Sequence, residues 1–168
     1  RALVARALAG RAEILFLEGY LYDKPKGKQA FERAVDLCHK AGGKAGIALS
    51  DPFCVDRYRD EFLDLMRKGT VDLIFANESE LHSLYQTSDF DGALKQLRAD
   101  TKLGVVTRSE KGCVVAAKDS VTSAPAFPIQ KLVDTTGAGD LFAAGFLFGL
   151  VRNAGHEMCG RLGALAAA

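Results

Sequence analysis

The sequence has few residues that could build a disulfide framework or a metal centre, with only four cysteines and three histidines in 168 residues. No two cysteines form a Cys-x-x-Cys pair, and the histidines stand at no ligand spacing from them. Such spacing argues against a zinc site and against a secreted, disulfide-stapled scaffold. We therefore expect a cytoplasmic protein with reduced structural thiols, which are Cys38, Cys54, Cys113 and Cys159.

The chain also lacks an excess of charge of either sign and any long hydrophobic run. Its 22 lysines and arginines are scattered and are balanced by 21 aspartates and glutamates, which predicts no nucleic-acid partner. The longest apolar run, 141–151, is far short of the roughly 20 residues of a membrane-spanning helix, so no membrane partner is expected. Arg6 and Arg11 interrupt the apolar opening of the chain, which predicts an amphipathic helix there and not a signal peptide.

What is present is an ordinary globular composition, 48% hydrophobic and 26% charged, which indicates one domain over residues 1–168. Short apolar runs alternate with longer amphipathic segments, as strands alternate with crossover helices. The predicted class is α/β, with a doubly wound, mostly parallel sheet flanked by helices. We expect strands at 14–17, 45–49, 71–76, 103–107 and 112–117, an edge strand or extended connection at 121–133, and helices at 28–40, 55–67, from about 77, at 90–98, at 138–152 and around 158–165.

The segment with the most distinctive chemistry is 134–142, Asp-Thr-Thr-Gly-Ala-Gly-Asp-Leu-Phe, which runs into the most apolar predicted helix. Gly137 and Gly139 allow a ligand to approach the backbone closely, and free amides at a helix start attract an anion. Asp140 lies where the helix dipole favours a carboxylate. If the bound phosphate is transferred, Asp140 is placed to accept the proton of an attacking hydroxyl.

A purely structural interpretation of this segment stays open, in which the glycines shape a tight turn and Asp140 caps the helix. Other glycine motifs fit less well. No Gly-x-x-x-x-Gly-Lys-Ser/Thr sequence occurs, and Phe142 stands where the dinucleotide fingerprint requires a third glycine. A dinucleotide-dependent oxidoreductase is therefore disfavoured.

Residues 134–140 resemble the second signature of the ribokinase-like (PfkB) family of carbohydrate and nucleoside kinases, Asp-Thr-x-Gly/Ala-Ala-Gly-Asp with an aromatic residue following. The resemblance implies transfer of the γ-phosphoryl group of ATP, with Mg²⁺, to a hydroxymethyl group of a sugar or nucleoside. It also implies a Rossmann-like three-layer α/β domain, which in the family carries a small β-sheet lid.

The resemblance assigns a role to each residue of the motif. Asp140 is implied as the catalytic base, and the amides of Gly137, Ala138 and Gly139 as the anion hole for the migrating phosphoryl group. Asp134 and Thr136 correspond to positions at which many members bind a monovalent cation, so K⁺ is a further expected ligand.

A second family motif, Asn-x-x-Glu, matches Asn77 and Glu80 directly after a predicted strand. In the family this pair helps to organise magnesium and phosphates. The same spacing is also a capping box, with Asn77 as the N-cap and Glu80 reaching back to it. The two roles are compatible, and we expect both.

A third match is Thr107 and Gly112 in the segment 107–112, where the family commonly has Thr-x-Gly-x-x-Gly along the nucleotide. Ser109 replaces the middle glycine and is expected either to contact phosphate or to occupy the turn. Gly112 is equally consistent with an ordinary hairpin turn. Glu18, Tyr20 and Asp51 follow predicted strands and are candidates for the cleft edge without a catalytic role, Asp51 also for a helix cap.

The resemblance covers the catalytic, nucleotide-binding half of a family whose members are roughly twice this length. The chain starts without methionine and ends inside a helical pattern. We therefore expect a fragment that lacks the lid and most acceptor contacts. The segments 49–53, 77–81 and 161–167 most resemble the adenosine-kinase side of the family, so a small-molecule nucleoside or sugar is the expected partner, with a homodimer as a candidate assembly. The alternative is a nucleotide-binding regulatory module without turnover.

Overall fold

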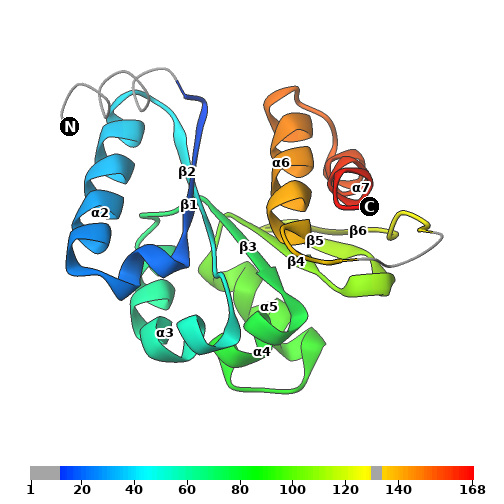
Figure 1. Cartoon of the computed structure of the whole chain (residues 1–168), viewed down its shortest axis with the longest axis horizontal. Helices are drawn as coiled ribbons and strands as arrows, with labels where there is room; N and C mark the ends of the chain where they lie inside the picture. The colour runs from blue at the N-terminus through cyan, green and yellow to red at the C-terminus, as the bar shows by residue number, and fades with distance from the viewer. Residues whose placement is uncertain (1–11, 130–133) are drawn as a thin grey trace.

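The computed structural model describes residues 12–129 and 134–168. The expected amphipathic helix at 1–11 and the end of the expected connection at 130–133 lie outside the described residues. Across the described part, the alternation of strands and helices follows the sequence prediction (Figure 1).

The centre of the fold is one six-stranded sheet with the strand order β1-β2-β3-β4-β5-β6. The first four strands are parallel, whereas β5 pairs antiparallel with β4, and β6 antiparallel with β5. The sheet is therefore mostly parallel. The edge strand or extended connection predicted at 121–133 forms a strand, β6, only as far as residue 124, and residues 125–129 continue without helix or strand. The strands are β1 (Ile14–Glu18), β2 (Lys44–Ala48), β3 (Leu73–Asn77), β4 (Leu103–Thr107), β5 (Cys113–Ala117) and β6 (Ser120–Ala124).

Helices cover both faces of this sheet, which gives the three layers of the predicted class. One face carries the helices that connect the parallel strands, and the other carries the last two helices (Figure 1). The first group is α2 (Pro25–Lys40), α3 (Pro52–Arg67), α4 (Glu78–Tyr85) and α5 (Phe90–Asp100), and the second is α6 (Ala138–Val151) and α7 (His156–Ala166).

Each helix layer buries its own apolar cluster against one face of the sheet, because successive strand residues point to opposite faces. Phe31, Phe62 and Leu97 belong to the cluster under α2–α5. On the opposite face, the Phe75 ring meets the Phe146 ring edge-on at a centroid distance of 5.5 Å. This contact holds α6 over the middle of the sheet.

Two helices begin earlier than the apolar spacing predicts, and in both the first residue is proline. Pro25 and Pro52 occupy the first helical position, where the missing proline N–H costs no intrahelical hydrogen bond. Asp51 caps α3 by accepting a hydrogen bond from the backbone N–H of Cys54 at 2.7 Å, so the capping interpretation of Asp51 is confirmed.

The parallel strands place their carboxyl ends at a single edge of the sheet. Glu18, Asn77 and Thr107 are the last residues of β1, β3 and β4, and α6 begins beside them. Open α/β sheets bind ligands at this edge. None of the helices in the described ranges is both long enough and apolar enough to cross a bilayer.

Candidate active site

The amino terminus of α6 is built by a glycine in the left-handed region. Gly137 has a φ of 77° and serves as the N-cap without a side-chain hydrogen bond. Its carbonyl accepts the first intrahelical bond, from the Leu141 N–H at 2.9 Å. A side chain at Gly137 would be strained by this φ, which explains the glycine in local terms.

The amides of this helix start are partly free. The Ala138 N–H donates to the Thr135 carbonyl at 3.1 Å, whereas those of Gly139 and Asp140 have no backbone acceptor among the described residues. A Cβ built on Gly139 would meet no atom within 4 Å. The helix start therefore presents open amides and an open space above them, which suits an anion.

Asp140 lies in the first turn of α6 and is exposed. It lines a cavity of about 130 Å³ together with Glu18, Ser50 and Glu80. The same carboxylate lines a wider cavity of about 750 Å³ with Glu18 and Tyr20. Asp140 is thus placed between a polar strand edge and an open space that can admit a small molecule.

Glu18 contributes a second carboxylate to this region. Burial raises the pKa of Glu18, and the nearby Asp140 raises it further, while a hydrogen bond from the Ser50 hydroxyl at 2.9 Å opposes them. Ser50 itself adopts a φ of 77°, a left-handed conformation uncommon for a residue with a side chain. The Tyr20 hydroxyl donates to Asp51 beside it.

Asn77 and Glu80 form the predicted capping box at the start of α4. The Glu80 N–H donates to Asn77 Oδ1 at 2.8 Å, and the Asn77 N–H donates to Glu80 Oε2 at 3.0 Å. Glu80 is only 6% exposed, and this burial raises its pKa to about 7. The capping role is confirmed, and the pair also lines the cavity of about 130 Å³ beside Asp140.

Thr107, Ser109 and Gly112 lie together on one wall of a third cavity, of about 860 Å³. This volume is within the range of pockets that hold nucleotide-sized ligands. A Cβ on Gly112 would come within 2.1 Å of the Ala124 carbonyl, and its φ is 85°. The hairpin interpretation of Gly112 is therefore confirmed, in a turn that borders the cavity.

The same cavity is also lined by residues that the sequence analysis did not identify. They come from the segment after β6 and from the end of α7, and only the folded chain brings them near Thr107. Their sole local signal is the exposure of large apolar side chains, with Phe127 47% and Ile129 50% exposed. The wall residues are Ala126, Phe127, Pro128, Ile129, Ala164, Ala167 and Ala168.

Gly139 is the residue at which the three cavities meet, because it lines each of them. Asp140 borders only the cavities on the Glu18 side, whereas Ala138 borders only the cavity on the Thr107 side. A chain of cavities therefore runs past the start of α6. The first turn of the helix lies between the cavity that Tyr20 lines and the cavity that Ser109 lines.

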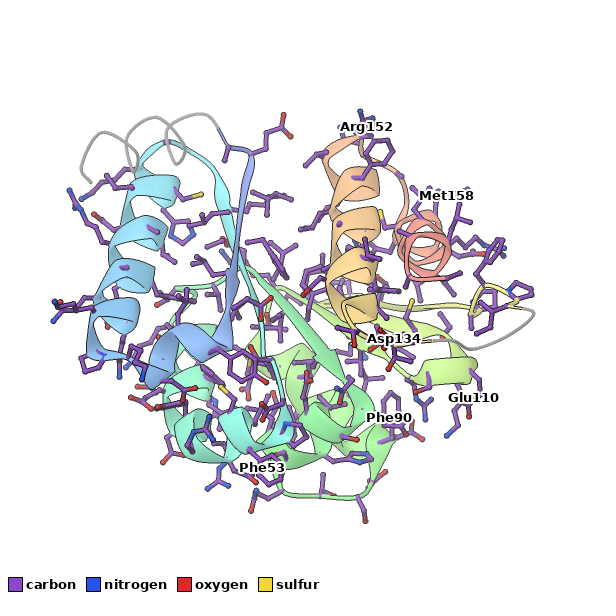
Figure 2. All side chains as sticks on the ribbon, in the orientation of Figure 1. Phe53, Phe90, Glu110, Asp134, Arg152 and Met158 are labelled. Carbon is purple, nitrogen blue, oxygen red and sulfur yellow. The ribbon has the colours of Figure 1, made fainter. Side chains whose placement is uncertain are left out.

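Asp134 and Thr136 lie at the foot of α6, and Figure 2 shows Asp134 on the same side of the fold as Glu110. Asp134 Oδ1 accepts hydrogen bonds from the backbone N–H and the hydroxyl of Thr136, both at 2.9 Å. The backbone hydrogen bond is the main cause that lowers the pKa of Asp134. The two residues thus stabilise the loop before the helix.

Within residues 12–129 and 134–168, no group of three or more histidine, cysteine or acidic side chains is arranged to hold a metal ion. The donors near Asp140 are carboxylate and amide oxygens. Magnesium prefers such donors and is commonly held by one or two carboxylates together with water and substrate phosphates. The residues present therefore fit a magnesium ion that is bound mainly through a nucleotide.

Comparison with known proteins identifies the class. Residues 2–168 match the family described as pfkB family carbohydrate kinase. The chain is 40% identical over 140 residues to a cytidine kinase of Thermococcus kodakarensis, covering 79% of this chain and 49% of that protein. It is 35% identical over 175 residues to adenosine kinase 1 of Arabidopsis thaliana, covering 95% of this chain and 49% of that protein.

Solved structures that resemble this chain are also kinases. The crystal structure of adenosine kinase from Sinorhizobium meliloti has a TM-score of 0.93 and 48% identity, covering 95% of this chain and 49% of that one. A probable sugar kinase from Rhizobium etli has a TM-score of 0.93 and 49% identity, over 95% of this chain and 48% of that one. The chain belongs to the pfkB family of carbohydrate kinases, with the ribokinase-like α/β fold. It spans about half the length of the relatives it matches.

Proposed function

We propose that this chain is the catalytic and nucleotide-binding domain of an ATP-dependent kinase that phosphorylates a hydroxymethyl group of a nucleoside or sugar. The observation that carries the proposal is the position of Gly139 at the junction of the three cavities, with Asp140 on one side only. ATP would occupy the cavity beside Thr107, and the acceptor would occupy the cavity beside Glu18.

In the proposed reaction, the acceptor oxygen bonds to the γ-phosphorus while the bond from that phosphorus to the β–γ bridging oxygen breaks, so that ADP leaves. Asp140 takes the proton of the attacking hydroxyl. The amides at the start of α6 donate hydrogen bonds to the phosphoryl oxygens, where charge is largest during transfer. Gly137 and Gly139 permit this approach because neither has a side chain.

The remaining site residues support this reaction from the ends of the strands. Asn77 and Glu80 would face the phosphates and magnesium, and magnesium supplies positive charge that offsets the charge of the phosphates. Thr107, Ser109 and Gly112 would form the wall along the nucleotide. Asp134 and Thr136 are proposed to bind a monovalent cation such as K⁺ at the loop before α6.

For the acceptor, we favour a nucleoside similar to adenosine over a simple sugar. Support comes from the relatives named adenosine kinase and cytidine kinase and from the solved adenosine kinase at 48% identity. The probable sugar kinase is as similar as that structure, at 49% identity. The cavity of about 750 Å³ beside Asp140 includes the exposed Tyr20 ring, a surface that could accept a flat base. A homodimer and a cytoplasmic location stay predictions.

An acceptor screen on the complete polypeptide that carries this chain tests the proposal. With ATP and magnesium, we expect phosphate transfer to adenosine or a related nucleoside to exceed transfer to ribose or fructose. Transfer to sugars alone would contradict the nucleoside preference. ATP binding without transfer to any nucleoside or sugar would instead favour the regulatory alternative.

A further inference from the structure

An ion pair joins the two strand ends that border the proposed nucleotide cavity. Asn77 and Thr107 are directly opposite each other in the β3–β4 pairing. The residues that follow them in the chain are Glu78, the first residue of α4, and Arg108. Arg108 Nε donates to Glu78 Oε2 at 3.1 Å, and Nη2 donates to Oε1 at 2.9 Å. This bidentate geometry fixes the relative position of the two loops more strictly than a single contact would.

Arg108 also contacts a third element. Its guanidinium carbon lies 3.6 Å from the centroid of the Phe90 ring, at the first residue of α5. The side chains of Arg108 and Glu78 are only 23% and 27% exposed, so salt screens the pair less than it screens a surface pair. Only a planar guanidinium can form the bidentate ion pair with Glu78 and stack on the Phe90 ring at the same time. A lysine ammonium forms neither contact well.

The turn that follows Arg108 contains a conformation that its sequence disfavours. Ser109 has a φ of 51°, in the left-handed region where glycine has no steric penalty. The turn is closed by the Arg108 N–H, which donates to the Gly112 carbonyl at 2.8 Å. Ser109, Glu110 and Gly112 of this turn line the cavity of about 860 Å³, whereas Arg108 does not.

We propose that Arg108 is a positioning residue for the nucleotide: by holding Glu78 and Phe90 it fixes the strained turn 108–112 in the conformation that ATP meets. This inference rests on the proposed function, in which that cavity holds ATP. The turn does not border the cavities that contain Asp140. Loss of the Arg108 contacts with Glu78 and Phe90 therefore weakens nucleotide binding and leaves the transfer step almost unchanged.

Nucleotide affinity in the complete polypeptide tests this inference, measured by calorimetric titration with magnesium and a non-hydrolysable ATP analogue. For Arg108→Ala we expect Kd and the KM for ATP to rise about tenfold while kcat stays within about threefold, because ground-state binding is lost. Arg108→Lys should be nearly as impaired as Arg108→Ala. Glu78→Gln, which keeps the shape of the side chain, should raise Kd less and serves if Arg108→Ala does not fold.

Two further variants separate positioning from general stability. Adding Ser109→Gly to Arg108→Ala should recover most of the nucleotide affinity. Glycine adopts the left-handed conformation without strain, so the turn no longer depends on the Arg108 contacts. Arg67→Ala removes another bidentate pair, with Asp100 at 3.0 Å for both contacts, far from the cavity. It should lower Tm without changing Kd.

The outcomes distinguish this inference from the function on which it rests. If the wild type binds the analogue and Arg108→Ala and Glu78→Gln bind it equally well, the inference is overturned and the kinase proposal stands. A fall in kcat with unchanged Kd also overturns it. If the wild type binds no nucleotide, both are overturned.

Discussion

At the scale of single residues, Asp140 is the group on which the proposed chemistry depends. Its carboxylate lines the cavities on the proposed acceptor side and lies in the first turn of α6. In the complete polypeptide, Asp140→Asn should lower kcat by about 10² to 10⁴ and leave the Kd for ATP nearly unchanged, because a general base acts only in the transfer step. Steady-state kinetics and titration check this expectation. Wild-type turnover in the variant would contradict the assignment.

Glu80 is predicted to make stability depend on pH. Burial raises its pKa from 4.5 to about 7, so the folded state binds its proton more tightly than the unfolded state does. The stabilisation is complete below pH 4.5 and is lost as pH rises through about 7. Relative to Glu80→Gln, which keeps a capping-box residue, the wild type should lose up to about 3 kcal/mol of unfolding free energy between pH 4.5 and 8.

Urea unfolding of both proteins across this pH range measures the difference, and groups that titrate alike in the two proteins cancel. Parallel pH profiles for the wild type and Glu80→Gln would contradict this prediction, because they would show that folding does not raise the pKa of Glu80.

Some residues of the site could be predicted from the sequence, and others could not. Asp140, Gly139 and Asn77 belong to short motifs whose spacing can be recognised in the sequence. Arg108 and Glu78 could not be paired in advance, because their contact depends on the register of β3 against β4. The wall at Phe127 likewise depends on how the chain returns from β6 to the cavity.

At the scale of elements, α6 contains one glycine that leaves space for a ligand, Gly139, and one that allows close helix packing, Gly145. Substitutions should separate these two roles. A Cβ at Gly139 would meet nothing within 4 Å, whereas one at Gly145 would come within 2.5 Å of the Leu162 carbonyl on α7. Gly145→Ala should therefore cost about 1–3 kcal/mol of stability through overpacking. Gly139→Ala should fold as well as the wild type, because alanine favours helix, and should lower kcat about 100-fold by obstructing the anion site.

Denaturant unfolding and kinetics on both variants test this division. A destabilised Gly139→Ala protein, or one with full activity, would contradict a functional reason for that glycine. The same stability for Gly145→Ala and the wild type would contradict the close α6–α7 contact.

The existence and type of the elements were predictable, and their starts less so. The apolar spacing located the strands and most helices, because each buries one periodic face. It placed the start of α2 at residue 28, whereas the helix begins at Pro25. Proline and glycine at 25–27 are typical of a turn, yet at a helix start proline costs nothing.

At the scale of the whole molecule, the carboxyl ends and the amino ends of the parallel strands have different roles. The proposed chemistry lies at the carboxyl ends of the strands, while Asp72 stabilises the amino ends. Asp72 is 8% exposed and accepts hydrogen bonds from the Ala45 N–H at 2.9 Å and from Lys102 Nζ at 2.6 Å. Burial raises its pKa, but these partners and His39 lower it below the ordinary value.

Asp72→Ala should lower the unfolding free energy by about 3 kcal/mol, because it leaves a buried amide without its acceptor and removes a partly buried ion pair. Nucleotide affinity should not change. Since the pKa of Asp72 is lowered on folding, its contribution is complete above the unfolded pKa of 3.8 and is lost as pH falls through the folded value. Thermal unfolding and titration measure both effects, and weaker ATP binding would contradict the separate roles of the carboxyl and amino ends.

The central claim is that the start of α6 holds the migrating phosphoryl group while Asp140 faces the acceptor hydroxyl. A crystal structure of the complete polypeptide with ADP, magnesium, a metal fluoride and adenosine tests it most directly, because the fluoride imitates the transferring group. The account predicts the fluoride within hydrogen-bonding distance of the Gly139 amide and the Asp140 carboxylate at the acceptor hydroxyl. A fluoride bound elsewhere, or Asp140 turned away from the acceptor, would contradict it.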